Sequence, residues 1–267
     1  MTKKTISLFL LFLTNANASE LDLGIGLSGL SYPDYVGSNN QNNLLIPYPY
    51  ISYRSEKLKI DNEGVQHKLY STNGFILKLS LSGTLPIKSS GVREGMDDLN
   101  AAGEIGPSLL YNVYRHNAFY IKAELPIRAV LSTDLKSIDY HGHIYEFKTT
   151  FGLKNKKGDL FEIETGPVWA NSKYHNYLYG VESKFTTKSR PKYESKGGYS
   201  GYKTSIGFSK SFDSFEVGAF ARHYTINGSS FSKSPLIEKN SALYGGFFIA
   251  YIFDKTFSNK VKEWVEK

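Results

Sequence analysis

The chain of 267 residues has no cysteine and only two methionines. The absence of cysteine excludes disulfide bonds and thiolate metal sites, so hydrogen bonds and packing must hold the fold together. Beyond its N-terminal region the sequence has no run of about 20 apolar residues, which excludes a bundle of membrane-spanning helices. It also lacks a Gly-x-Ser-x-Gly motif, the nucleophile signature of the α/β-hydrolases.

Aromatic residues are abundant instead. The chain holds 20 tyrosines and 17 phenylalanines, while the mean hydropathy is only −0.33 and the net charge is +7. Membrane β-barrels combine such values, because apolar and polar residues alternate along each strand and aromatic girdles mark both membrane interfaces. The composition therefore favours an all-β membrane protein of one domain.

The N-terminus resembles a secretory signal peptide. Lys3 and Lys4 precede an apolar run from Ile6 to Leu13, and Ala16-Asn17-Ala18 provides a small-x-small cleavage site. The apolar run is far shorter than a membrane anchor requires. We therefore expect residues 1–18 to be a cleaved signal peptide and the remaining chain to be exported.

The longest alternation of apolar and polar residues runs from Phe119 to Leu131, where every odd position is apolar and Lys122, Glu124 and Arg128 lie between. This period of two indicates a strand with one apolar side. Soluble strands average about six residues, whereas a strand that crosses a bilayer needs about 9–11. The length therefore favours contact of the apolar side with lipid.

Similar alternation recurs along the chain. We count ten clear strands and two weaker ones, near Leu58–Tyr70 and Tyr174–Val181. Residues 19–253 are thus predicted to form an antiparallel transmembrane β-barrel of about twelve strands, with ten as the alternative. A secreted β-sandwich with a solvated charged side is the other interpretation of the same pattern. The longer polar stretches lie near residues 33–43, 86–101, 132–144, 183–200 and 227–240.

Short links alternate with these long stretches, for example at residues 155–159 and 211–214, as in barrels with short periplasmic turns and longer outer loops. The last strand ends at Phe253, and residues 254–267 follow it. Val261, Trp264 and Val265 have helical spacing there. We expect residues 254–267 to form a periplasmic tail.

The strand faces opposite the apolar ones carry charges of both signs. Lys or Arg at the bilayer midplane would cost about 2–4 kcal/mol each, so these faces should line the barrel interior. Five cations and six anions suggest a lumen partly filled by ion pairs rather than an open channel of one sign. The predicted lumen charges are Lys78, Glu104, Lys122, Glu124, Arg128, Glu146, Lys148, Glu162, Glu164, Glu216 and Arg222.

Catalytic and metal sites receive little support. His141 and His143 flank Gly142 and could share a metal, but metal binding needs three or four convergent ligands, which favours a solvated loop pair. His223 lies on a strand whose probable neighbour carries Ser205 and Ser209. A serine–histidine pair there would suit a lipid-modifying barrel enzyme. Serine is so frequent that a chance pairing is expected, so we predict no catalytic residue, metal or cofactor.

A basic segment with interspersed aromatic residues is a candidate anion-binding loop. An exported chain does not routinely meet nucleic acid, so lipopolysaccharide phosphates or acidic cell-wall polymers are the better partners. Simple solvation of a surface loop is the alternative. The candidate residues are Lys184, Lys188, Arg190, Lys192 and Lys196.

Several short motifs resemble the MipA/OmpV family, the MltA-interacting proteins of Gram-negative outer membranes. They cover the chain in the family's order, and the most specific one is the stretch from Gly166 to Tyr174. The motifs are Tyr32–Ser38, Arg93 with Asp97–Leu99 and Glu104–Gly106, Gly166–Tyr174, Tyr177–Val181, Ser189–Tyr193 with Gly197-Gly198, and Ser234–Ile237.

The resemblance implies a non-enzymatic outer-membrane barrel. One family member is a scaffold between a murein hydrolase and a murein synthase, and others are linked to adhesion or solute uptake. The leading hypothesis is therefore a monomeric scaffold in peptidoglycan remodelling, in contact with outer-membrane lipid and lipopolysaccharide. A small-solute pore, an adhesin and a lipid-modifying enzyme are the alternatives.

Overall fold

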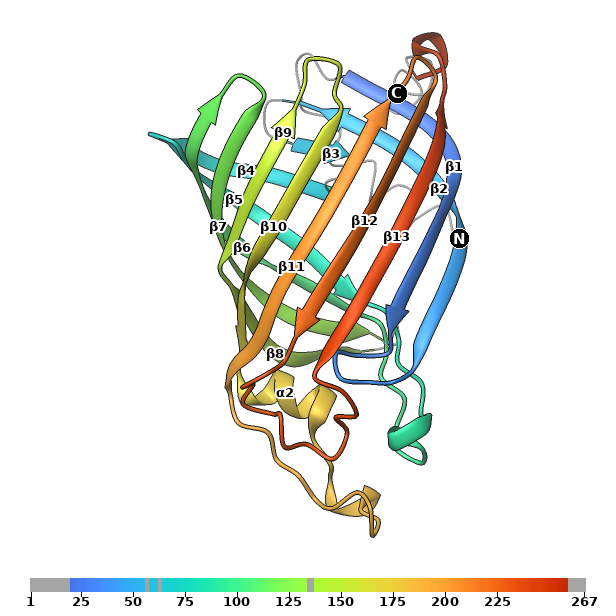
Figure 1. Cartoon of the computed structure of the whole chain (residues 1–267), viewed down its shortest axis with the longest axis vertical. Coiled ribbons are helices and arrows are strands. Elements are labelled where there is room, and N and C mark those ends of the chain that lie inside the picture. Colours follow the sequence, from blue (N-terminus) through green and yellow to red (C-terminus); the bar gives the residue numbers. More distant parts are fainter. Residues whose placement is uncertain (1–19, 56–57, 62–63, 134–136, 259–267) are drawn as a thin grey trace.

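The protein is a closed antiparallel β-barrel in a computed structural model that describes residues 20–55, 58–61, 64–133 and 137–258 (Figure 1). The predicted signal peptide and the helical spacing around Trp264 lie outside these residues. The strands are β1 (Glu20–Pro33), β2 (Gln41–Arg54), β3 (Leu58–Asp61), β4 (Gly64–Thr72), β5 (Phe75–Thr84), β6 (Ala102–His116), β7 (Phe119–Thr133), β8 (Ile138–Glu146), β9 (Lys148–Lys154), β10 (Leu160–Ala170), β11 (Gly198–Ser211), β12 (Phe215–Thr225) and β13 (Ser241–Ile252).

The pairing of the strands closes the barrel. Each strand pairs with its neighbours in the chain, and β1 pairs with β13 in antiparallel register. The segments β8 and β9 are two halves of one barrel strand, because both lie between β7 and β10 and only Phe147 separates them. The described part of the barrel thus has twelve strands, which confirms the predicted fold and strand number.

The composition of the twelve strands differs from the prediction in two places. Residues Tyr174–Val181, predicted as a weak strand, instead lie mostly in a helix, α2 (Ser172–Tyr179). The predicted strand near Leu58–Tyr70 is two strands, β3 and β4. Strand β2 contains Pro47 and Pro49, which have no N–H to donate to a neighbouring strand.

The apolar sides of the strands form the outer surface. On β7, Leu125 and Ile127 are 47% and 46% exposed, whereas the flanking residues Glu124 and Arg128, on the other side of the strand, are 6% and 7% exposed. Strand β7 has 15 residues, enough to cross a bilayer. The outward residues therefore form a belt that suits contact with lipid, and the charged residues point into the barrel. No described helix is long and apolar enough to span a membrane.

The two ends of the barrel differ. One end carries both described chain ends and short links such as Asn73-Gly74, whose positive φ angles of 43° and 84° fit a tight hairpin turn (Figure 1). The other end carries the long links after β1, β5, β10 and β12, together with α2. We call these the turn end and the loop end.

The link after β7 is shorter than expected. Residues 132–144 were predicted as a long polar stretch, yet β7 continues to Thr133 and β8 begins at Ile138. His141 and His143 are therefore strand residues, and the expectation of a loop pair was wrong. The alternation there is obscured by a β-bulge, because Val130 pairs with Gly142 and Leu131 pairs with Tyr140.

Candidate functional site

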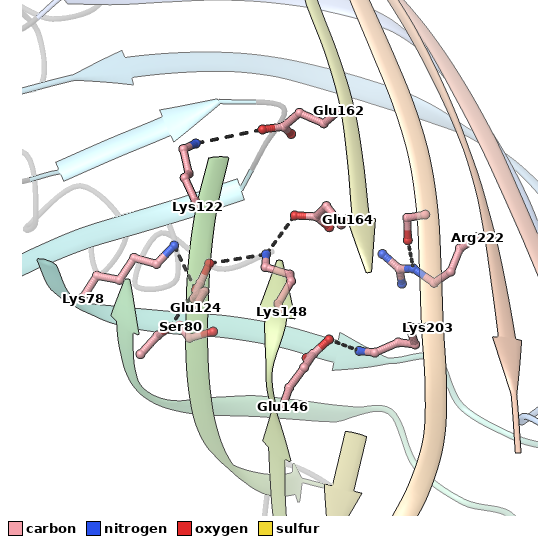
Figure 2. Close-up of polar contacts among 12 residues, drawn as sticks. Lys78, Ser80, Lys122, Glu124, Glu146, Lys148, Glu162, Glu164, Lys203 and Arg222 are labelled. Carbon is pink, nitrogen blue, oxygen red and sulfur yellow. Dashed lines mark hydrogen bonds and ion pairs between the residues drawn. The ribbon is translucent and has the colours of Figure 1, made fainter. Parts of the chain in front are cut away.

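The charged barrel interior is the first of two candidate sites. Most of the eleven predicted lumen charges are joined in ion pairs along the inner wall formed by β5 to β11 (Figure 2). Their strands place them there because residues two apart in a strand share one side. Some opposing charges lie on neighbouring strands, as Arg128 and Glu104 do, and others are one strand further apart, as Lys78 and Glu124 are.

Arg128 is the centre of one group of ion pairs. Its Nε donates to Oε2 of Glu104 and its Nη2 donates to Oε2 of Glu146, both at 2.9 Å. Lys203 of β11 lies 2.6 Å from the other oxygen of Glu146. All four side chains are at least three-quarters buried. Each of these buried charges therefore lies beside an opposite charge, which offsets the free-energy cost of removing it from water.

Lys148 is the centre of a second group. Its Nζ lies 2.9 Å from Glu164 and 3.4 Å from Glu124, which also contacts Lys78 at 3.0 Å. Figure 2 shows these side chains of β5, β7, β9 and β10 pointing toward one another. Lys122 and Glu162 form a looser pair at 4.0 Å. These ion pairs extend across several strands of the inner wall, and their side chains occupy part of the lumen.

Two lumen charges have other environments. Glu216 accepts a hydrogen bond from the hydroxyl of Tyr50 at 2.7 Å, and Arg222 donates from Nε to Oγ of Ser205 at 2.9 Å. The sequence analysis missed Lys203 and Tyr50 as lumen residues. Lys203 alternates with the outward Tyr202, so its position in the strand could have revealed it.

The second candidate site is a hydrophobic cluster that covers the loop end of the barrel. We call it the loop cap, and it combines residues from all four long links with residues of α2. Its members are Tyr35, Val36, Ile87, Met96, Leu178, Tyr179, Val181, Ile226, Phe231, Leu236 and Ala242. Phe231, Ile226 and Leu236 are at most 1% exposed, so the links form a packed layer over the lumen.

Hydrogen bonds tie the loop cap together. The hydroxyl of Tyr35 donates to the carbonyl of Leu236 at 2.7 Å, and that of Tyr179 donates to the carbonyl of Val36 at 3.1 Å. Burial raises the pKa of both tyrosines, so both hydroxyls stay protonated and can donate. Ser234 in turn donates to the carbonyl of Tyr179 at 2.7 Å. Motif segments far apart in the sequence thus meet in this layer.

The helix α2 is positioned by Asn171. Its side-chain oxygen accepts hydrogen bonds at 3.1 Å from the backbone N–H of Tyr174, as an N-cap does, and from that of His143 on β8. Gly142 leaves the necessary space, since a Cβ there would lie 2.3 Å from Oδ1 of Asn171, and its φ of +117° also favours glycine. The bulge in β8 therefore anchors the helix.

The predicted anion-binding loop is largely engaged in contacts within the protein. Arg190 is buried, and its guanidinium donates to the backbone carbonyls of Phe185, Val92 and Glu94 at 2.7–3.0 Å. Lys184 lies 3.3 Å from Asp97, and Lys192 lies 3.0 Å from Glu194. Lys188 and Lys196 are exposed. The five side chains do not converge, and Arg190 stabilises the loop cap instead.

The histidines at the loop end have separate roles. His141 stacks on Tyr177 of α2, with ring centroids 3.8 Å apart, whereas His143 is hydrogen-bonded to Tyr140. The two imidazoles therefore contact different residues and do not form a pair. In the described part of the chain, no group of three or more His, Cys, Asp or Glu side chains is placed to hold a metal ion.

The serine–histidine pair considered for β11 and β12 is not formed. His223 faces Thr204 and Leu243 on the outer side, whereas Ser205 faces Arg222 on the inner side. The sheet separates the imidazole from both Ser205 and Ser209, because side chains of opposite parity point to opposite faces. This removes the arrangement on which the lipid-modifying alternative rested.

Cavities remain inside the described part of the barrel. One, of about 510 Å³, lies among Lys78, Lys122 and Glu162 and is called the vestibule. Another, of about 390 Å³, lies beneath Tyr35, Tyr179 and Phe231 of the loop cap and is called the cap cavity. Arg222, Phe220 and Leu30 line both cavities, which are therefore adjacent.

Known proteins resemble this chain in sequence and in fold. The outer membrane protein Omp26La of Vibrio anguillarum is 24% identical over 218 residues, covering 75% of this chain and 76% of the relative. The NanC porin structure has a TM-score of 0.38 at 6% identity and covers 87% of this chain and 99% of its own. OprB of Pseudomonas putida has a TM-score of 0.36 at 7% identity, with coverages of 94% and 96%.

The apolar belt around a closed barrel and the relationship to an outer-membrane protein together place this chain in the outer membrane. The family described as MltA-interacting protein MipA matches residues 25–253, nearly the whole described barrel. The resemblance of the sequence motifs to that family is thereby confirmed. The chain belongs to the MltA-interacting protein MipA family.

Proposed function

We propose that this barrel is a non-enzymatic scaffold of the outer membrane that binds a murein hydrolase on its periplasmic side. The observation that carries the proposal is the loop cap, which covers the end of the lumen where a pore would open to the outside. A barrel covered at one end, with ion pairs filling part of its interior along one wall, is poorly suited to rapid solute flow. The family description supports a hydrolase of the MltA type as the partner.

The turn end is the proposed binding surface. In bacterial outer-membrane barrels the short turns face the periplasm, where murein enzymes act. The described start of the C-terminal tail lies at this end, since the N–H of Leu23 donates to Oγ of Ser258 at 3.3 Å and Phe257 contacts Phe253. A monomeric barrel would offer these turns to a partner without rearrangement of its strands.

Site-directed photo-crosslinking in intact envelopes tests this proposal. A photoreactive residue at Asp213 or Lys156, both in short turns, should capture a murein hydrolase or synthase. The same residue at Lys188, which is exposed at the loop end, serves as the matched control and should not capture it. The proposal fails if the turn positions capture neither class of enzyme, or if Lys188 captures them equally.

A small-solute pore is the second candidate. The observation in its favour is the interior space, because the vestibule and the cap cavity together leave much of the lumen unfilled. Swelling of liposomes that contain the purified barrel, measured with small sugars, tests it. Swelling at the rate of an open porin would favour the pore, whereas rates near those of empty liposomes would favour the scaffold.

A further inference from the structure

Arg222 of β12 differs from the other lumen cations. Lys78, Lys122, Arg128, Lys148 and Lys203 each lie within 4.0 Å of a glutamate. Arg222 has no acidic partner among the described residues, and its one hydrogen bond there is from Nε to Ser205. Since a guanidinium carries five N–H groups, the Nη1 and Nη2 groups are left to bind something else.

The position of Arg222 makes those groups accessible to a ligand. Its side chain lines the vestibule, the cap cavity and a small recess beside Glu146 and Glu164. Figure 2 shows its guanidinium apart from the ion pairs of Lys148 and from the ion pair of Lys203. The ring of Phe220 lies beside it, with the centroid 5.9 Å from Cζ. A solute that enters from the vestibule therefore meets Arg222 at the boundary of the cap cavity.

Three tyrosine hydroxyls face the same cavity. Tyr174, Tyr224 and Tyr244 line the cap cavity, and their hydroxyls have no hydrogen-bond partner in the described part of the chain. Tyr244 is also the cross-strand neighbour of Arg222, on the same inner side. The free N–H groups of Arg222 and the three hydroxyls along this cavity therefore offer several hydrogen-bond donors to an acceptor.

The rest of the cap cavity combines apolar walls with charged side chains, among them Asp34, Glu104, Arg128 and Lys203. Leu30, Ile144, Val168 and Phe231 contribute to its walls, and its volume of about 390 Å³ lies within the range of small-molecule sites. An inorganic ion would leave these walls in contact with empty space or loosely held water. A ligand with one anionic group and an apolar body would match both Arg222 and the apolar parts of the walls.

We propose that the barrel interior binds a small organic carboxylate with an apolar body. The carboxylate accepts two parallel hydrogen bonds from Nη1 and Nη2 of Arg222, the arrangement that a guanidinium favours. The hydroxyls of Tyr244 and Tyr224 donate to the same group, and the apolar body lies against Phe220 and Phe231. This proposal does not depend on the scaffold function, since the ligand occupies the lumen rather than the turns.

Isothermal titration calorimetry on the full-length barrel in detergent tests the site, with benzoate as the probe at neutral pH. Benzoate should bind with saturation at one site, whereas benzyl alcohol, which has the same ring without the charge, should not. Phenyl phosphate, whose headgroup is tetrahedral and can carry two negative charges, should bind more weakly than benzoate. Absence of saturation by benzoate at millimolar concentrations, or stronger binding of phenyl phosphate, would overturn the proposal.

Variants separate the site from the general charge of the lumen. Arg222→Gln should weaken benzoate binding by about tenfold or more, and Tyr244→Phe by about threefold. Lys78→Gln removes one lumen cation that is already paired with Glu124, so it should leave the affinity nearly unchanged. Heat-dependent mobility on gels checks that each barrel is folded. Equal losses in Arg222→Gln and Lys78→Gln would refute a specific site.

Discussion

Tyr179 of α2 and Phe231 of the link between β12 and β13 stack face to face, with ring centroids 3.8 Å apart and planes within 7°. Both side chains are at most 3% exposed. The pair joins two segments that lie 52 positions apart in the sequence, so it fixes the helix to another link of the loop end. The loop cap therefore depends on a contact that barrel closure by itself does not create.

Loss of this contact should open the loop end. Phe231→Ala removes a fully buried ring, which typically costs about 3–5 kcal/mol in packing. We expect a higher single-channel conductance in planar bilayers while the strands remain folded. Phe215→Ala removes an exposed outer ring and is the control that should leave conductance at the wild-type value. A wild-type conductance in folded Phe231→Ala would contradict a sealing role.

The loop cap should weaken in mild acid because of His175. The imidazole is fully buried, its Nδ1 donates to the carbonyl of Lys196, and its Nε2 accepts from Ser200, both at 2.7 Å. Burial lowers the pKa of His175, so the closed cap holds a neutral ring. The opened cap takes up a proton more readily, so stability is complete above about pH 6.5 and falls as the pH drops below it.

Hydrogen–deuterium exchange of α2, corrected for the intrinsic effect of pH, measures this prediction. Exchange should be faster at about pH 5 than at about pH 7.5 in the wild type. In His175→Gln the ring is absent, and the difference between the two pH values should shrink. An equal pH dependence in both proteins would show that another group is responsible.

Removal of Arg128 should destabilise the barrel more than removal of a surface cation. Arg128→Met leaves Glu104 buried without its partner, and breaking a buried pair in this way typically costs about 3–5 kcal/mol. Urea unfolding in lipid vesicles, followed by tryptophan fluorescence, gives the free energy. Lys184→Met disrupts an exposed pair with Asp97 and should leave the free energy unchanged within error. Similar values for both variants would argue against a structural role for the lumen pairs.

A cation on the outer belt should also destabilise the barrel. Leu125 is 47% exposed on β7 and faces the predicted hydrocarbon. Leu125→Arg should reduce the free energy of unfolding in vesicles by about 2–4 kcal/mol, the cost of arginine near the bilayer midplane. Lys122→Arg on the inner side of the same strand keeps the charge and should change it by under about 0.5 kcal/mol. No loss in Leu125→Arg would place that residue outside the hydrocarbon.

The barrel could be predicted because alternation is a local property of each strand. Leu125 and Glu124 are adjacent in the sequence, so they lie on opposite sides of their strand whatever the neighbouring strands are. Prediction failed where local patterns are ambiguous. The eight residues of α2 contain several aromatic residues that also suit a strand, and only Asn171, held between β8 and the helix, selects the helical form.

The sequence by itself determined the barrel, the approximate number of strands and the division between an apolar outer side and a charged inner side, because a period of two sets these directly. Only the tertiary structure decided what each charge and each loop does. Arg190 was predicted to face an external anion and Arg222 to belong to the lumen charges, yet Arg190 is enclosed by backbone carbonyls and Arg222 lines two cavities. Pairing between distant residues depends on strand register and loop packing, which no local pattern specifies.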